Sequence, residues 1–94
     1  MSARCTISVK IANRLGLHAR PAMELVDAAS RFRSEIVICR ADRPDEEVDG
    51  KSIMQVMMLA ATQGTELKIS ADGDDAHDAC DELKRLVEGG FDEE

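Results

Sequence analysis

Two periodicities of apolar residues alternate along this 94-residue chain, and they constrain its fold more than any other feature. From Cys5 to Ile11, apolar and polar residues alternate one by one, which is typical of a strand with one buried and one solvated face. From His18 to about Ser30, the apolar residues recur every three or four positions, which predicts a helix with one buried stripe. That stripe consists of Ala22, Leu25, Val26, Ala29 and Phe32.

A second strand is predicted over 34–40, where the one-by-one alternation returns. Ile36 and Ile38 are expected to face the core, and Val37 and Cys39 to face outward. This strand therefore also has one buried face, and it can join the first strand in a common sheet.

The remaining elements follow the same two patterns. We expect a short acidic edge strand over 46–49, a short helix from Ser52 to about Ala60, a strand over 65–71 and a last helix that ends at Gly89 and Gly90. The residues expected to face the core in these elements are Val56, Leu59, Ala60, Leu67, Ile69, Ala71, Ala76, Ala79, Cys80, Leu83, Leu86 and Val87.

These elements predict an α+β fold in two layers. Each helix has a single apolar stripe and the better strands have a single apolar face. The simplest way to bury both is an antiparallel sheet covered on one face by three helices. The chain order is strand, helix, strand, strand, helix, strand, helix, and residues 1–94 are expected to form a single domain because no linker or repeat interrupts them.

Composition excludes several classes of function. The chain has 12 basic and 19 acidic residues, a net charge of −7, so general nucleic-acid binding is not expected. No apolar run reaches the length of a membrane span, and the polar start of the chain leads directly into a strand pattern. Three cysteines without a Cys-x-x-Cys pair indicate reduced thiols, and we expect a cytoplasmic protein that does not bind a membrane.

The segment from Gly16 to Ala22, Gly-Leu-His-Ala-Arg-Pro-Ala, combines residues suited to carrying an anion. Pro21 is tolerated in a first helical turn, so a helix is predicted to begin at or just after His18. Free N–H groups and the positive end of the helix dipole would then lie beside the His18 imidazole and the Arg20 guanidinium. A lone histidine at a helix start can also be purely structural, but this combination favours a phosphate-carrying group.

This segment resembles the active-centre motif of the HPr family, the histidine phosphocarriers of the bacterial phosphotransferase system. A second match, Gly-Lys-Ser-Ile-Met over residues 50–54, resembles the regulatory serine region of the same family. The resemblance covers essentially the whole chain and implies an open-faced β-sandwich with strand order 1-4-2-3. It also implies a phosphohistidine at His18, on the pros nitrogen Nδ1, with Arg20 assisting. The protein would be a stoichiometric carrier, not an enzyme, with no cofactor.

Ser52 has two compatible interpretations. Ser52 and Gln55 fit a capping box, in which the serine accepts a helical N–H and the glutamine reaches back to the serine N–H. The resemblance also implies a serine that an HPr kinase/phosphorylase phosphorylates with ATP. A phosphate there would oppose docking of an acidic partner.

The short helix carries more apolar residues than one side can bury. Methionines often fill gaps in a core, but a helix of under three turns has only one side against the sheet. We therefore expect Ile53, Met54 and Met57 to form an exposed docking surface beside His18. The resemblance implies that such positions contact enzyme I and sugar-specific enzyme II A-type acceptors. The full set of docking residues is expected to be Leu17, Arg20, Lys51, Ile53, Met54 and Met57.

Several alternatives remain open. The segment 13–16 and the tail 90–94 resemble the nitrogen-related branch, NPr, with its own acceptors, whereas residues 51–54 resemble the sugar branch. A regulatory adaptor that acts through Ser52 is a second alternative, although such adaptors lack the active histidine. A hydrolase lacks a carboxylate or metal cluster near the motif to activate water. His77 has no second ligand at metal-binding spacing, so no metal is expected, and we expect a monomer.

Overall fold

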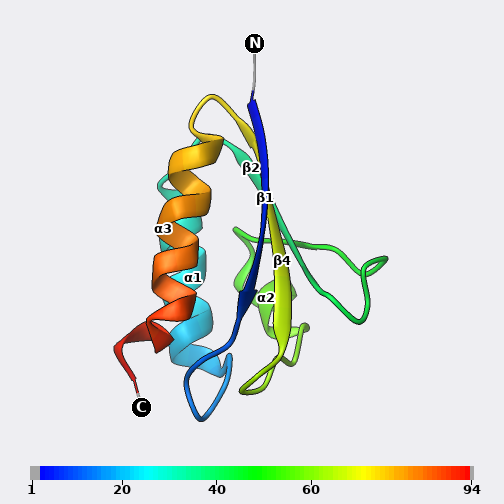
Figure 1. Cartoon of the computed structure of the whole chain (residues 1–94), viewed down its shortest axis with the longest axis vertical. Helices are drawn as coiled ribbons and strands as arrows, with labels where there is room; N and C mark the ends of the chain where they lie inside the picture. Colours follow the sequence, from blue (N-terminus) through cyan, green and yellow to red (C-terminus); the bar gives the residue numbers. More distant parts are fainter. Residues whose placement is uncertain (1–2, 94) are drawn as a thin grey trace.

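The computed structural model describes residues 3–93, which form a four-stranded antiparallel sheet with helices packed against it (Figure 1). The strands are β1 (Ala3–Lys10), β2 (Glu35–Arg40), β3 (Val48–Asp49) and β4 (Glu66–Gly73), and their order in the sheet is β1-β4-β2-β3. The helices are α1 (Ala19–Ser30), α2 (Ile53–Met57) and α3 (Ala76–Glu88), followed by a 3₁₀ turn, η1 (Gly90–Asp92). The predicted α+β open-faced sandwich and its strand order are confirmed.

The register of the sheet brings the predicted core residues together. Ile69 on β4 lies opposite Ile7 on β1 and opposite Ile38 on β2. Leu67 and Ala71, two residues to either side on β4, are also fully buried. Alternation along β4 therefore places one apolar row against the helices, as the one-by-one pattern predicts.

The helices lie along one another over this apolar face. Helix α3 packs on β1 and β4, and α1 lies between α3 and α2. Residues Ala22, Leu25 and Ala29 of α1 are buried, which confirms that stripe of the helix. No helix within residues 3–93 is long and apolar enough to cross a membrane.

Cys39 differs from the expectation for an outward-facing residue. Its side chain alternates with those of Ile36 and Ile38, yet the residue is only 6% exposed. Strand β2 lies between β4 and β3, and the register places Lys68 directly beside Cys39. Burial, followed by the nearby charge of Glu47, raises the pKa of the Cys39 thiol. Cys39 is therefore buried by the strands on either side of β2 and by neighbouring side chains such as Lys68, although it points away from the helices.

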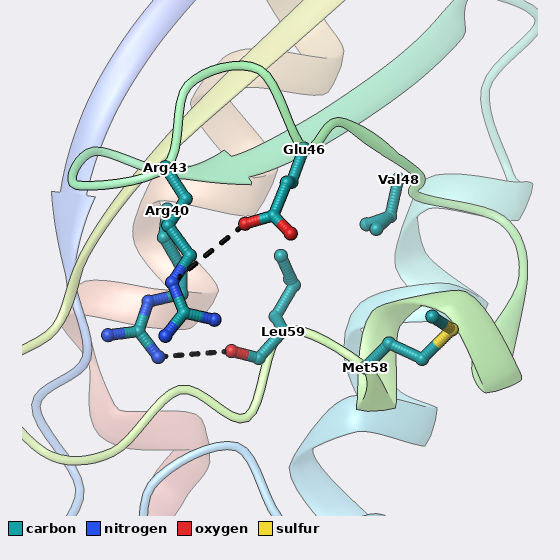
Figure 2. Close-up of a pocket in the computed structure, with 6 residues that line it drawn as sticks. All are labelled: Arg40, Arg43, Glu46, Val48, Met58 and Leu59. Carbon is teal, nitrogen blue, oxygen red and sulfur yellow. Dashed lines mark hydrogen bonds and ion pairs between the residues drawn. The ribbon is translucent and has the colours of Figure 1, made fainter.

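Helix α2 is shorter than predicted, because the chain leaves the helix before Ala60. The backbone of Ala60 has a positive φ of 49°, and Ala60 is exposed rather than directed to the core with Val56 and Leu59. Arg40 donates from Nη1 to the carbonyl oxygen of Leu59 at 3.3 Å (Figure 2). It also donates to the carbonyl oxygen of Ala60 at 3.4 Å. These bonds attach the segment that follows α2 to β2.

Candidate functional site

A tightly bonded loop positions His18. The side-chain amide of Asn13 donates to the Gly16 carbonyl at 2.7 Å, and the Gly16 N–H donates to the Asn13 carbonyl at 3.1 Å. The N–H of Leu17 donates to the Ala61 carbonyl at 2.9 Å. Gly16 has a φ of +69°, and a Cβ there would lie 2.6 Å from the Ala61 oxygen. Glycine is required at this position, and the loop reaches His18 with little freedom.

His18 is the N-cap residue of α1. Its backbone is extended, and its carbonyl accepts the first helical hydrogen bond from Ala22 at 2.9 Å. Its side chain does not cap the helix, so the ring is available for other contacts and is 38% exposed. The N–H groups of Ala19 and Arg20 precede the first intrahelical bond, and Pro21 has no N–H. The predicted arrangement of an imidazole beside the positive end of a helix is therefore present.

The ring contacts a carboxylate that the sequence interpretation missed. His18 Nε2 lies 3.0 and 3.2 Å from the two carboxylate oxygens of Glu93. The amide of Asn13 donates to the same carboxylate at 3.0 Å. These hydrogen bonds, the one from His18 contributing most, lower the pKa of the Glu93 carboxyl. Within residues 3–93, the His18 ring forms no hydrogen bond through Nδ1.

The segment 90–93, which follows α3, is held in place by Phe91. After α3 ends, Gly90 adopts a φ of +68° and the Phe91 side chain is 2% exposed in the core. Gly90 lies close to Asn13, and the Glu93 N–H donates to the Gly90 carbonyl at 2.9 Å. The sequence signal that could have indicated this fold-back is Phe91, an aromatic residue directly after Gly89 and Gly90.

Arg20 is placed beside the site but does not contact the ring. Its side chain is 75% exposed, and its Nε lies 3.6 Å from a carboxylate oxygen of Glu24, one helical turn further along. An exposed pair of this kind contributes little to stability. The guanidinium is therefore available to an incoming anion, because only a weak contact must be broken.

Two of the expected docking residues are placed differently from the expectation. Leu17 is buried in the core, because its N–H bond to Ala61 draws this part of the loop against the body of the protein. Lys51 donates from Nζ to the Phe32 carbonyl at 2.7 Å, just beyond the C-terminal end of α1. A helix of 12 residues is about 18 Å long, so Lys51 does not join Arg20 in a basic cluster around His18.

Ser52 is confirmed as the N-cap of α2, but the capping box is only half formed. The Ser52 hydroxyl accepts the Gln55 N–H at 3.3 Å. The Ser52 N–H already donates to the Asp49 carbonyl, so the Gln55 side chain accepts the Asp49 N–H instead, at 2.9 Å. Ser52 therefore has a structural role that links α2 to the end of β3.

The expected division of the two sides of α2 is confirmed at Val56, Leu59, Met54 and Met57, and it is wrong at Ile53 and Ala60. Val56 and Leu59 are buried, whereas Met54 is 78% and Met57 is 41% exposed. Ile53 is half-buried and packs against the core. We refer to Ile53, Met54 and Met57 together as the docking surface, after the role that the sequence led us to expect. The sequence interpretation did not identify Leu15, Met23 and Met58, which are further large apolar side chains exposed within residues 3–93.

This arrangement suits the transfer of an anionic group through a ring nitrogen. An unpartnered Nδ1 can act as a nucleophile, and the free helical N–H groups and Arg20 can bind the oxygens of a phosphoryl group. Glu93 adds a negative charge on the other side of the ring, which the sequence interpretation did not include.

The family of the chain is shown by comparison with known proteins. The family model described as "PTS HPr component phosphorylation site" matches residues 5–89. The phosphocarrier protein HPr of Pseudomonas putida is 48% identical over 85 residues, which cover 90% of this chain and 92% of that protein. The phosphocarrier protein NPr of Proteus mirabilis is 40% identical over 86 residues, which cover 92% of this chain and 93% of that protein.

Solved structures agree with this result. The crystal structure of HPr-C-His from Thermoanaerobacter tengcongensis superimposes with a TM-score of 0.88 at 41% identity, and covers 96% of this chain and 98% of that one. The crystal structure of HPr from Bacillus anthracis has a TM-score of 0.83 at 35% identity, over 90% of this chain and 98% of that one. The chain therefore belongs to the HPr family, the phosphocarrier proteins of the phosphotransferase system.

Proposed function

We propose that this protein accepts a phosphoryl group from phosphorylated enzyme I on Nδ1 of His18 and passes it to enzyme II A-type acceptor domains or their nitrogen-branch equivalents. The observation that carries the proposal is the free Nδ1 of a ring whose Nε2 is already bonded, at a helix end with unpaired N–H groups. We further propose that the chain acts as a single cytoplasmic domain over residues 1–94, and as a monomer.

Transfer requires one bond to form and one to break. The lone pair of Nδ1 attacks phosphorus, the bond between phosphorus and the donor breaks, and the donor keeps that electron pair. The protein contributes positioning and electrostatics, because phosphoryl transfer asks for little other chemistry from it. The N–H groups of Ala19 and Arg20 and the Arg20 guanidinium would then stabilise the bound phosphate. The resulting P–N bond is weak enough for the group to be passed onward.

Labelling with phosphoenolpyruvate and enzyme I tests this proposal. We expect one phosphoryl group per chain, in a linkage that is labile in acid and stable in base. His18→Ala should abolish the labelling. His77→Ala is the matched control, because His77 is exposed on α3 and should leave labelling unchanged. Full labelling of the His18→Ala variant would contradict the proposal.

We also propose regulation through Ser52, if a kinase of the HPr kinase/phosphorylase class acts on it. Ser52 lies directly before Ile53 and Met54 of the docking surface, and near the end of α1 opposite to His18. A phosphate on Ser52 would therefore act by placing negative charge beside the docking surface rather than by contacting the His18 ring. Ser52→Asp should raise the KM for enzyme I more than it lowers kcat.

A second candidate function follows from the relatives themselves, which include proteins named HPr and proteins named NPr. The chain could serve the nitrogen branch, or act as a regulatory adaptor through binding alone. Phosphoryl transfer rates to a sugar-branch and to a nitrogen-branch acceptor, measured side by side, would distinguish the branches. An adaptor would bind a partner equally well after His18→Ala.

A further inference from the structure

We propose that Glu93 is a positioning residue for phosphoryl transfer: its carboxylate holds the hydrogen of the His18 ring on Nε2 and so keeps the lone pair on Nδ1. This inference rests on the proposed function, in which Nδ1 is the reacting atom. It concerns the tail of the chain, which lies beyond residues 5–89 of the matched family region.

The chemistry of the contact determines the tautomer. A neutral imidazole has one N–H and one nitrogen with a lone pair, and an ionised carboxylate can only accept hydrogen bonds. Both Glu93 oxygens lie within 3.2 Å of Nε2, so Nε2 must be the nitrogen that carries the hydrogen. Nδ1 is then unprotonated and able to attack phosphorus. A ring without this contact would divide its hydrogen between the two nitrogens, and the fraction with hydrogen on Nδ1 could not react.

The position of Glu93 is fixed by contacts that do not involve the ring. The Asn13 amide donates one hydrogen bond to Glu93 and another to the Gly16 carbonyl, so it joins the tail to the loop that precedes His18. Phe91 is buried two residues before Glu93, and the Glu93 N–H bonds to Gly90. The Glu93 side chain is itself only 15% exposed. These contacts make the carboxylate a part of the site, in the manner of the outer partners that orient metal-binding histidines.

The same contact should strengthen as the reaction proceeds. When Nδ1 shares its electron pair with phosphorus, the ring gains positive charge while Nε2 keeps its hydrogen. The hydrogen bond from Nε2 to Glu93 then becomes a bond between two charged groups, which is shorter and stronger than the neutral bond. An interaction that is stronger in the transition state than before it accelerates the step.

Nitrogen NMR and transfer kinetics on the whole protein test the proposal together. We would label the histidines with ¹⁵N and record the His18 ring in its neutral form in wild type, Glu93→Ala and Glu93→Gln. Glu93→Ala should shift both ring nitrogens toward a mixture of tautomers and slow phosphoryl transfer from enzyme I by about tenfold, the effect of losing one hydrogen bond to a charged group. Glu93→Gln should retain much of the tautomer preference, because its carbonyl oxygen still accepts, but lose part of the rate.

Asp92→Asn is the matched control. Like Glu93→Gln, it replaces a carboxylate by an amide and so removes one negative charge. Asp92 is exposed and does not contact the ring. It should leave the ring shifts and the rate at wild-type values. Unchanged ring shifts in Glu93→Ala, or an unchanged rate, would overturn the proposal, as would an equal effect of Asp92→Asn. The NMR measurement needs no phosphoryl donor, so absence of labelling in the wild type would refute the proposed function separately.

Discussion

The loop that carries His18 and the helix that carries the docking surface are held very differently. Around His18, backbone and side-chain hydrogen bonds join the loop, the segment after α2 and the tail. On α2, Met54 is exposed, and the helix has only five residues. If the proposed function holds, the difference has a physical reason: the proposed reacting atom needs a fixed position, whereas a surface proposed to meet several partners benefits from side chains that can adapt.

The core under α2 should give the largest effect on stability. Leu59→Ala removes a side chain that is almost fully buried, and we expect it to lower the free energy of unfolding by about 2–5 kcal/mol. Urea denaturation measures the loss. Phosphoryl transfer by the fraction that remains folded should stay close to normal. A specific loss of transfer in well-folded protein would show that this core residue belongs to the site.

The loop should be sensitive to one added methyl group. Gly16→Ala would place an alanine in the left-handed backbone region, and its Cβ would clash with the Ala61 carbonyl oxygen. We expect the substitution to lower the free energy of unfolding by about 1–3 kcal/mol and to slow phosphoryl transfer. Gly64→Ala is the matched control, since Gly64 also has a positive φ but has open space around it. Gly64→Ala should lower the free energy of unfolding by less than Gly16→Ala does, and it should leave phosphoryl transfer unchanged. Equal effects of the two variants on transfer would contradict a fixed loop.

The junction between β2 and α3 should lose stability in acid. Asp75 accepts hydrogen bonds from the Ser34 hydroxyl at 2.6 Å and from the N–H groups of Arg33 and Ser34, which lowers its pKa from 3.8 to about 2. A lowered carboxyl pKa stabilises the folded state above the unfolded value of 3.8, and this contribution is lost as the pH falls through about 2.

Asp75→Asn should therefore be less stable than wild type at neutral pH, and the difference between the two proteins should shrink toward pH 2. Urea denaturation over this pH range measures it. Asp74→Asn, at an exposed neighbour, should show a much smaller pH-dependent difference. An equal difference in stability between wild type and Asp75→Asn at pH 7 and at pH 2 would contradict a stabilising role of the ionised Asp75 carboxylate.

The docking surface should give the smallest effect on stability. Replacing both Met54 and Met57 by alanine removes mainly exposed area, so the free energy of unfolding should fall by less than about 1 kcal/mol. The same change should raise the KM for enzyme I, because it removes apolar contacts without altering His18. Severe instability of this double variant would mean that the buried and exposed sides of α2 are reversed.

The sequence predicted the features that depend on local pattern and missed those that depend on distant contacts. Alternation along β4 and the stripe on α1 identified the core, and Pro21 identified the helix start at His18. The strand order came from family resemblance, because periodicity does not specify which strands pair. Glu93 could not be inferred from spacing, since it lies 75 positions after His18, and long-range contacts such as the burial of Phe91 and the Asn13 hydrogen bond bring it back to the ring.

Lys51, beyond the C-terminal end of α1, is a second residue whose contacts the sequence pattern did not predict. It directly precedes Ser52 in the sequence, yet its ammonium group is bound to the Phe32 carbonyl rather than placed near His18. The start of α2 lies near the end of α1 that is opposite to His18, and the local sequence pattern does not specify this tertiary contact. Lys51 therefore does not add a positive charge next to the His18 ring.

The position of the phosphoryl group on the phosphorylated protein tests the central claim most directly. After reaction with phosphoenolpyruvate and enzyme I, the coupling between phosphorus and ¹⁵N in the His18 ring shows which nitrogen carries the group. A fixed loop, an Nε2 held by Glu93 and a free Nδ1 predict a single phosphoryl group on Nδ1 of His18. Phosphorus bonded to Nε2, or a group on any other residue, would contradict this account.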